Sequence, residues 1–161
     1  MYRKIIVALD NSPLSQKAFQ QSLSIAKAFN AELQLFNVIS SSEAEYRDTV
    51  SLTGSGYYSQ NASTINEIKQ EKWQLLVENN FDDLQSLVEQ AAQVGVSAEL
   101  VQEIGQPERQ ICKYAQEWEA DLIVIGSHGR KGLSELLIGS VSNYVSHNVP
   151  CDVMLVHQQA N

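Results

Sequence analysis

Five short apolar segments, separated by longer stretches with helical periodicity, dominate the pattern of hydrophobic and polar positions along the chain. The first segment reads KIIVALD, and a later one contains four consecutive apolar residues at 122–125. Short continuous apolar runs are typical of strands buried on both faces, as in a parallel sheet covered by helices. We therefore predict strands at 4–10 and 32–38, a third and more amphipathic strand at 97–103, a fourth strand from Asp121 and a fifth from Asp152.

The interval after the first strand has the features of a well-bounded helix. Ser12 is a suitable N-cap, Pro13 suits the first helical position, and Asn30 suits the end of a helix that runs to Phe29. Its spacing of small and apolar residues predicts an inward face made of Ala18, Ser22, Ile25 and Phe29.

Helical patterns fill the other intervals as well. A long helix is predicted from Thr64, which forms a capping-box pattern with Glu67, to about residue 94. A shorter helix follows Pro107, and a last one starts at Gly139-Ser140 and ends before residue 150. Strands that alternate with helices imply an α/β fold, in which right-handed crossovers give a doubly wound parallel sheet.

Glycines cluster where the fourth strand ends. Gly126, Gly129 and Gly139 are followed by Ser140, with the spacing Gly-x2-Gly-x9-Gly-Ser. Glycines after a strand let the backbone turn sharply and approach a ligand closely. A helix that starts at Gly139-Ser140 would offer free N–H groups and the positive end of its dipole to an anion. Ser140 can cap this helix and also offer its hydroxyl and N–H to phosphate. The stretch therefore predicts a phosphate cradle.

This spacing resembles the nucleotide-binding signature of the universal stress protein family, specifically of its ATP-binding branch. The resemblance extends along nearly the whole chain and implies a five-stranded parallel sheet of order 3-2-1-4-5, which is Rossmann-like and similar to adenine nucleotide hydrolases. In that order, ligands bind at the switch point between the first and fourth strands. The ATP-site residues implied by the resemblance and the strand ends are Ala8, Leu9, Asp10, Val38, Ile125, Gly126, His128, Gly129, Arg130, Gly139, Ser140 and Val141.

Three of these residues also have simpler interpretations. Asp10 contacts the nucleoside if the resemblance holds, yet a carboxylate at the start of a helix is also favourable by itself. Val38 either lines the adenine site or belongs to the core. His128 has no carboxylate or nucleophile beside it in the sequence, so a nucleotide contact or a turn is favoured over a general base.

Several catalytic motifs are absent from the sequence. It contains no P-loop lysine motif, no Gly-x-Gly-x-x-Gly after the first strand and no Gly-x-Ser-x-Gly elbow. No catalytic residue and no metal ligand is assigned, so any Mg²⁺ is expected to be carried by the phosphates of ATP. ATP hydrolysis, if it occurs, is expected to be slow.

Composition restricts the partners. The 161 residues carry a formal net charge of −8, which disfavours nucleic acid and anionic membranes as partners. Two cysteines without metal-ligand spacing and an N-terminus without a signal-peptide pattern predict a cytoplasmic protein with reduced thiols. We expect one domain, with a mobile surface insert at about 40–62, where Ser, Gly, Tyr and Asn show no regular period.

The sequence thus favours an ATP-binding regulatory protein in stress response, which acts through a nucleotide-dependent conformational change or an unknown protein partner. The alternatives are a slow ATPase and a structural or interaction module that does not use nucleotide. The fifth strand would lie at an edge of the sheet and has four consecutive apolar residues at 153–156. Exposed edges must be covered or paired, which predicts a homodimer through this strand.

Overall fold

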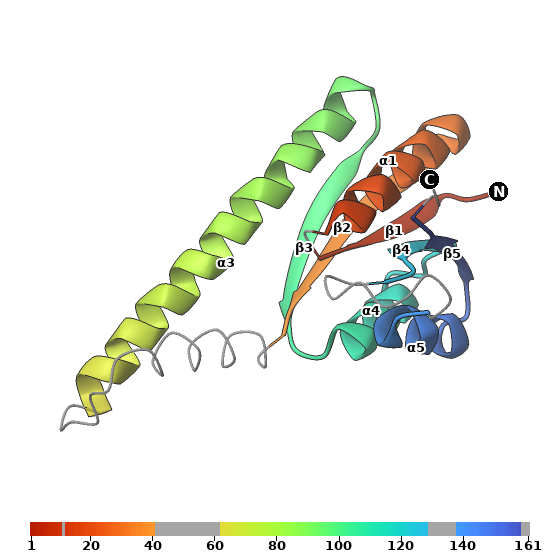
Figure 1. The fold of residues 1–161 in the computed structure, drawn as a ribbon. Coiled ribbons are helices and arrows are strands. Elements are labelled where there is room, and N and C mark those ends of the chain that lie inside the picture. Colours follow the sequence, from red (N-terminus) through yellow and green to blue (C-terminus); the bar gives the residue numbers. More distant parts are fainter. Residues whose placement is uncertain (11, 41–61, 129–137, 159–161) are drawn as a thin grey trace.

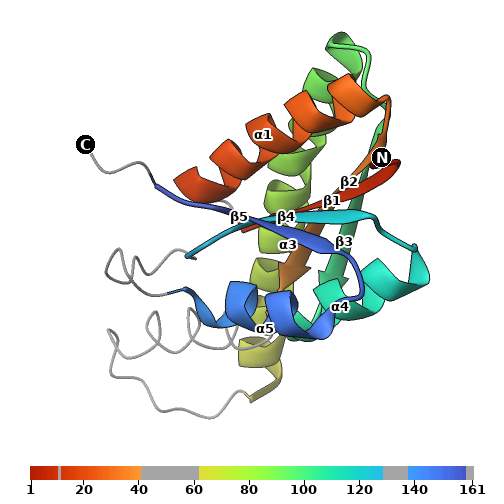
Figure 2. The same ribbon diagram turned by 90° about the vertical axis from the view of Figure 1, so that its right-hand side faces the viewer.

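The computed structural model describes residues 1–10, 12–40, 62–128 and 138–158, and it contains one five-stranded sheet with helices on both faces (Figure 1, Figure 2). The predicted strands and helices are all present, with bounds that differ from prediction by one or two residues. Their order is β1 Lys4–Leu9, α1 Pro13–Phe29, β2 Glu32–Ile39, α3 Ala62–Gln93, β3 Ala98–Ile104, α4 Pro107–Glu117, β4 Leu122–Gly126, α5 Ser140–Asn148 and β5 Asp152–Val156.

The sheet is parallel throughout and has the order β3-β2-β1-β4-β5, which confirms the predicted topology. Strands β2 and β3 lie on one side of β1, and β4 and β5 lie on the other side, so the order of strand addition changes direction between β1 and β4. Val7 of β1 is paired with Val124 of β4 at this point. In open α/β sheets, ligands bind beyond the carboxyl ends of the strands at this point. The fold therefore places the ends of β1 and β4, with their following loops, side by side.

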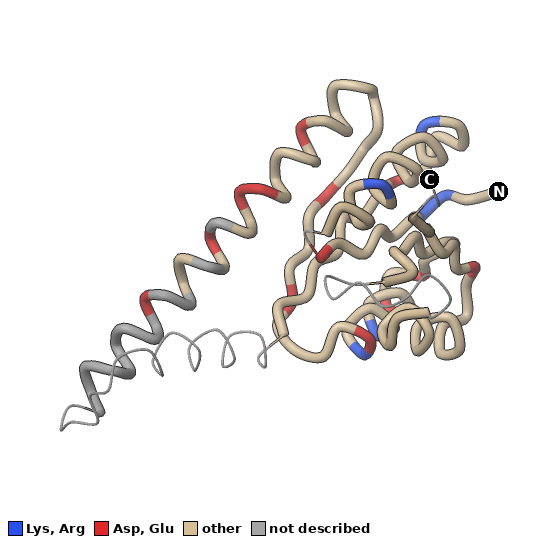
Figure 3. Tube along the Cα trace, viewed as in Figure 1, with Lys and Arg blue, Asp and Glu red and all other residues tan. Residues whose placement is uncertain are grey.

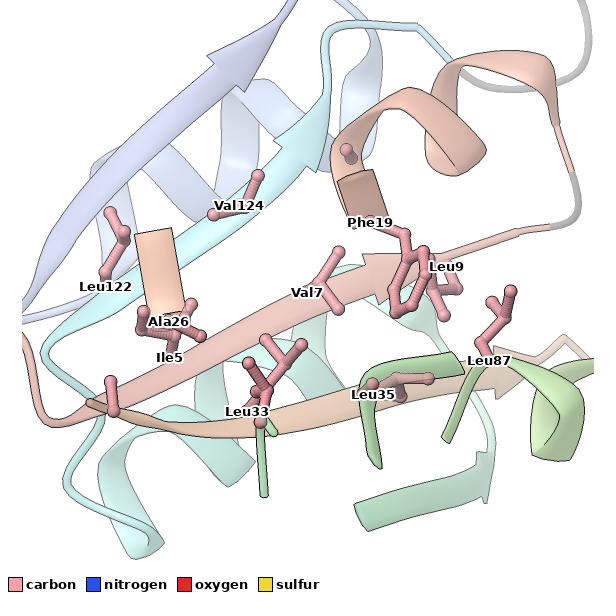
Figure 4. Close-up of a cluster of buried hydrophobic side chains, with 14 of the residues drawn as sticks. Ile5, Val7, Leu9, Phe19, Ala26, Leu33, Leu35, Leu87, Leu122 and Val124 are labelled. Carbon is pink, nitrogen blue, oxygen red and sulfur yellow. The ribbon is translucent and has the colours of Figure 1, made fainter. Parts of the chain in front are cut away.

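Two apolar clusters hold the helices against the sheet. Successive side chains of a strand point to opposite faces, so β1 contributes Ile5, Val7 and Leu9 to one cluster and Ile6 and Ala8 to the other. The first cluster also contains residues of α1 and α3 (Figure 4), and the second contains residues of α4 and α5. Complete burial of one such aliphatic side chain stabilises the fold by about 1.5–3 kcal/mol.

Helix α1 begins and ends as predicted. Ser12 is its N-cap, and the Ser12 hydroxyl accepts a hydrogen bond from the Ser15 amide at 3.1 Å. Pro13 occupies the first turn, and Asn30 ends the helix in the left-handed conformation with φ 53°. The expected signals at both ends are therefore confirmed by the geometry.

The inward face of α1 is only partly the predicted one. Ala18 and Ser22 are buried as predicted, but Phe19 and Ala26 complete the buried stripe. Phe29 is 43% exposed, and its ring packs edge-on against Tyr2 with 5.5 Å between the ring centroids. The prediction for Phe29 was wrong because the last turn of α1 lies against the N-terminal segment instead of over the core.

Helix α3 begins at Ala62, two residues before the predicted start. The side chains of Thr64 and Glu67 lie outside the described part of the chain, so the capping box stays a prediction. The C-terminal half of the helix packs on the sheet, with Leu84, Leu87 and Ala91 buried. The N-terminal half extends past the sheet (Figure 1). Acidic residues recur along the part of this helix that Figure 3 does not draw in grey, which suits a surface exposed to water.

The predicted insert falls mainly on residues 41–61, which lie outside the described residues, so its mobility stays a prediction. In the described ranges, no helix is both long enough and apolar enough to cross a membrane.

Asp121 joins the starts of β1 and β4. Its Oδ2 accepts hydrogen bonds from the backbone amides of Arg3 at 2.8 Å and Lys4 at 2.9 Å. Its own amide donates to the Lys4 carbonyl at 2.8 Å. The hydrogen bond from the Arg3 amide has the largest effect on the carboxylate, followed by the one from the Lys4 amide. Together they lower the pKa of Asp121 below its usual value of 3.8.

Replacing this carboxylate should reduce stability in a pH-dependent way. Asp121→Asn should lower the free energy of unfolding at pH 7 by about 1 kcal/mol, a modest value because the group is largely exposed. Since the folded-state pKa is lowered, the contribution is present above 3.8 and is lost as pH falls through the lowered pKa. Urea unfolding of both proteins at several pH values measures this; a difference that stays constant down to pH 3 would contradict it.

Candidate functional site

Four of the predicted site residues lie in one apolar cluster at the carboxyl end of the sheet. Ala8 and Ile125 are buried there, and they directly follow the paired residues of β1 and β4. Val38 at the end of β2 and Val141 in the first turn of α5 are partly buried against the same cluster. The structure therefore brings together the apolar half of the predicted site, on the sheet face that α4 and α5 cover.

Leu9 does not contribute its side chain to this group. It is 4% exposed and packs on the other face of the sheet, in the cluster with α1 and α3. Only the backbone of Leu9 is therefore placed to contribute at the strand end, and its role at the site stays a prediction.

The carboxylate of Asp10 participates in the turn between β1 and α1. Its Oδ1 accepts a hydrogen bond from the Ser12 amide at 3.1 Å. The helix-start interpretation of Asp10 is thus observed directly. The nucleoside contact remains compatible with it, since a carboxylate can accept several hydrogen bonds.

Gly126 ends β4 under the first turn of α1. A Cβ atom at this position would lie 3.1 Å from Cγ of Leu14 and 3.4 Å from the carbonyl oxygen of His128. Gly126 therefore has a packing reason to lack a side chain in addition to any ligand. Sequence spacing alone does not reveal the contact with Leu14, because it depends on how α1 lies across β4.

The third glycine of the motif closes the loop that follows β4. The Gly139 amide donates to the Ser127 carbonyl at 2.6 Å, and the Ser142 hydroxyl donates to the same carbonyl at 3.0 Å. A Cβ atom on Gly139 would lie 3.1 Å from that carbonyl oxygen. Both ends of the loop are thus fixed at one point beside Gly126.

The start of α5 differs from the prediction in one respect. Gly139 is the N-cap, and Ser140 is the first helical residue, with an exposed side chain. No side-chain hydrogen bond caps the helix, so the expected capping role of Ser140 was wrong. Because Ser140 does not cap, its hydroxyl is available for another role.

The loop also contains buried polar atoms that sequence reasoning only partly identified. In the part of the chain that the structure describes, Ser127 Oγ and His128 Nδ1 are buried and have no hydrogen-bond partner. Ser127 is completely buried and was not predicted as a site residue. The position of Ser127 between a buried strand and the glycine loop was the one feature of the sequence that could have identified it as a site residue. Such unpaired groups are rare, and one explanation is a ligand that is not part of the structure.

Two predicted site residues, Gly129 and Arg130, lie outside the described residues, so their roles stay predictions. Among the side chains that the structure describes, no three His, Cys, Asp or Glu residues form a group able to hold a metal ion. The cysteines Cys112 and Cys151 are free, and burial raises the pKa of both thiols.

A parallel sheet of order 3-2-1-4-5, with a glycine loop closed at its switch point, defines a Rossmann-like α/β protein. A family model described as "Universal stress protein family" matches residues 1–157. The chain belongs to the universal stress protein family.

Known proteins support this assignment over the whole length of the chain. Universal stress protein Sll1388 of Synechocystis is 36% identical over 155 residues, which cover 96% of this chain and 97% of that protein. The solved structure of MJ0577, a universal stress protein of Methanocaldococcus jannaschii, has a TM-score of 0.78 and 25% identity, with 100% of this chain and 99% of that chain covered.

Two further solved structures are described with a nucleotide. A universal stress protein in complex with cAMP has a TM-score of 0.60 and 24% identity, with 97% of each chain covered. A universal stress protein family member from Arabidopsis thaliana with AMP bound has a TM-score of 0.61 and 19% identity, with 98% of this chain and 93% of that chain covered. At these identities the likeness establishes a common fold.

Proposed function

We propose that this protein binds ATP at the carboxyl ends of β1 and β4 and acts as a nucleotide-dependent regulator in stress response. The observation that carries the proposal is the closure of the glycine loop, in which Gly139 and Ser142 both donate to the Ser127 carbonyl. This closure holds the first turn of α5 beside the end of β4. Helix starts favour phosphate through their free N–H groups and dipole.

The residues at the loop fit a phosphate group. A Cβ atom on Gly139 would lie 3.1 Å from the Ser127 carbonyl oxygen, so the closure that holds the start of α5 in place requires a residue without a side chain. The unpaired Ser127 Oγ, the His128 ring and the exposed Ser140 hydroxyl are candidate polar contacts. Arg130 would add positive charge. The two relatives described with cAMP and AMP support an adenine nucleotide as the ligand.

The apolar cluster supplies a second part of the proposed site. Ala8, Val38, Ile125 and Val141 would contact the adenine ring, and Asp10 would contact the ribose or base. Apolar walls with a few polar groups are typical of sites for small molecules. Any Mg²⁺ would be carried by the phosphates of ATP.

Identifying the small molecule that co-purifies with the protein tests this proposal. The protein is denatured, and its supernatant is examined by mass spectrometry, with calorimetric titration of ATP into ligand-free protein as the second measurement. We expect an adenine nucleotide in the supernatant and saturable binding of ATP. Absence of both would refute the proposal, whereas rapid turnover of ATP would favour an enzyme over a regulator.

A substitution of Asp10 should show whether this residue contacts the nucleoside part of ATP or its phosphates. Asp10→Ala should weaken ATP binding about tenfold, the effect of one or two lost hydrogen bonds, and leave the affinity for inorganic triphosphate unchanged. Titration calorimetry with both ligands measures this. Ser12→Ala is the matched control, because it removes the cap of α1 and keeps the carboxylate. An equal loss for both ligands would place Asp10 outside the nucleoside contact.

We further propose a homodimer through β5. Within the described residues, β5 pairs only with β4 and therefore forms an edge of the sheet. Val153, Met154 and Leu155 are each only partly buried in the single chain. Pairing of two such strands would satisfy the unpaired backbone groups of both edges.

A further inference from the structure

Asn37 is a buried polar residue in an otherwise apolar strand. It lies near the end of β2 and is 2% exposed. Its Nδ2 donates to the Leu9 carbonyl at 2.8 Å, and its Oδ1 accepts from Asn80 Nδ2 and from Gln102 Nε2, both at 3.0 Å. One amide thus connects β1, β2, β3 and α3.

These contacts lie at the level of the proposed site. Leu9 and Gln102 are the strand neighbours of Asn37 in the register of the sheet, and Leu9 is the last residue of β1. The carbonyl that Asn37 holds belongs to the peptide unit that leads into Asp10. Val38, which follows Asn37, points to the opposite face and packs against the cluster that contains Ala8.

Core packing alone does not require an amide at this position. A buried amide is costly unless its groups are paired, and a leucine of similar size would fill the space without that cost. A fully paired polar network in an apolar region fixes one arrangement of the groups it joins. What the amide adds here is the orientation of the end of β1 relative to β2, β3 and α3.

We propose that Asn37 is a positioning residue for the nucleoside half of the nucleotide site. It holds the Leu9 carbonyl, and through it the Leu9–Asp10 peptide, at the place from which Asp10 and the backbone of β1 meet the ligand. This inference rests on the proposed function. The contact from Asn80 also connects the site to α3.

The link to α3 gives the proposal a regulatory consequence. If the arrangement held by Asn37 favours nucleotide, then nucleotide must favour that arrangement to the same extent, because coupling between two equilibria is reciprocal. Binding of ATP should therefore slow backbone amide exchange in α3 around Asn80. In the absence of the Asn80 side chain, this distant protection should disappear while the affinity for ATP falls by less than about twofold.

The test compares two replacements of Asn37 with two controls. Asn37→Leu removes all three hydrogen bonds, and Asn37→Asp, while ionised, removes the donor to Leu9 but keeps the acceptor for Asn80 and Gln102. Asn80→Leu and Gln102→Leu each remove one of the two hydrogen bonds to Asn37 Oδ1 and leave the bond to Leu9 intact. The measurements are affinity for ATP and for inorganic triphosphate by calorimetry, and hydrogen exchange at the Ser12 amide, which reports the Asp10 turn.

We expect both Asn37 variants to bind ATP about tenfold more weakly than the wild type, with unchanged affinity for triphosphate and faster exchange at Ser12. Both controls should stay within about twofold of the wild type. If Asn37→Leu does not fold, Asn37→Asp alone decides the question.

Wild-type affinity in a folded Asn37 variant would overturn the positioning role and leave the proposed function standing. An equal loss in all four variants would also overturn it, since that result indicates general destabilisation. If the wild type itself does not bind ATP, both proposals fail, and this is seen before any substitution is made.

Discussion

A methyl group on Gly139 should abolish most ATP binding: we expect Gly139→Ala to weaken it by about a hundredfold or more. The added Cβ would lie 3.1 Å from the Ser127 carbonyl oxygen and 3.4 Å from His128 Cα. Both neighbours are backbone atoms and cannot rotate away. The start of α5 would have to move from the end of β4, and several charge-assisted hydrogen bonds to phosphate would be lost together. Calorimetric titration of ATP measures the effect.

Gly126 offers a matched control because its close neighbour is a flexible side chain. The Cβ of Gly126→Ala would meet Cγ of Leu14 at 3.1 Å, and Leu14→Ala would remove that contact. If Gly126 serves packing only, the double variant Gly126→Ala with Leu14→Ala should bind ATP as tightly as Leu14→Ala alone. If the backbone of Gly126 approaches phosphate, the double variant should bind ATP more weakly than Leu14→Ala alone. Normal affinity in a folded Gly139→Ala protein would contradict the phosphate cradle.

Leu155→Pro should convert the proposed dimer into a monomer with a largely intact fold. The Asp152 amide and the Val156 carbonyl both point towards β4, where they bond to Asp121 and Ser127. Because successive residues of a strand point their backbone groups to opposite sides, the Leu155 amide points away from β4, to the free edge. Proline there removes an edge donor and leaves the pairing of β4 with β5 in place.

Met154→Pro is the opposite substitution, and it makes the test specific. The Met154 amide points towards β4 by the same alternation, so proline at this position should break the ladder and lower the melting temperature. Met154→Lys is a poorer choice, because the Met154 side chain packs against the cluster under α1. A wild-type protein that has monomer mass at micromolar concentration would end the dimer proposal, and a dimer that survives Leu155→Pro would place the interface elsewhere.

The fold could be predicted from the sequence because its signals are local. Continuous apolar runs identified β1, β4 and β5, a more amphipathic segment identified β3, and Ser12, Pro13 and Asn30 marked the ends of α1. The strand order followed from the resemblance to a known family, since no periodicity specifies which strands are neighbours. The glycine spacing predicted the two points that the structure brings together, at the end of β4 and at the start of α5.

What escaped prediction depends on contacts between segments that are distant in sequence. Asn37 looked like one polar position in an apolar strand, and its partners Leu9, Asn80 and Gln102 lie on three other elements. Leu14 restricts Gly126 only because α1 crosses the end of β4. Such roles arise from the packing of the finished fold, which single-chain patterns do not contain.

Helix α3 affects how the assembly of this protein must be measured. Its 32 residues span about 48 Å, which exceeds the roughly 26 Å of the eight-residue β2, and one end extends past the sheet (Figure 1). A molecule with such a projection experiences more friction in solution than a sphere of equal mass. On a gel-filtration column calibrated with globular standards, a monomer would elute early and resemble a larger species. The mass in solution must therefore come from sedimentation equilibrium or light scattering, which do not depend on shape.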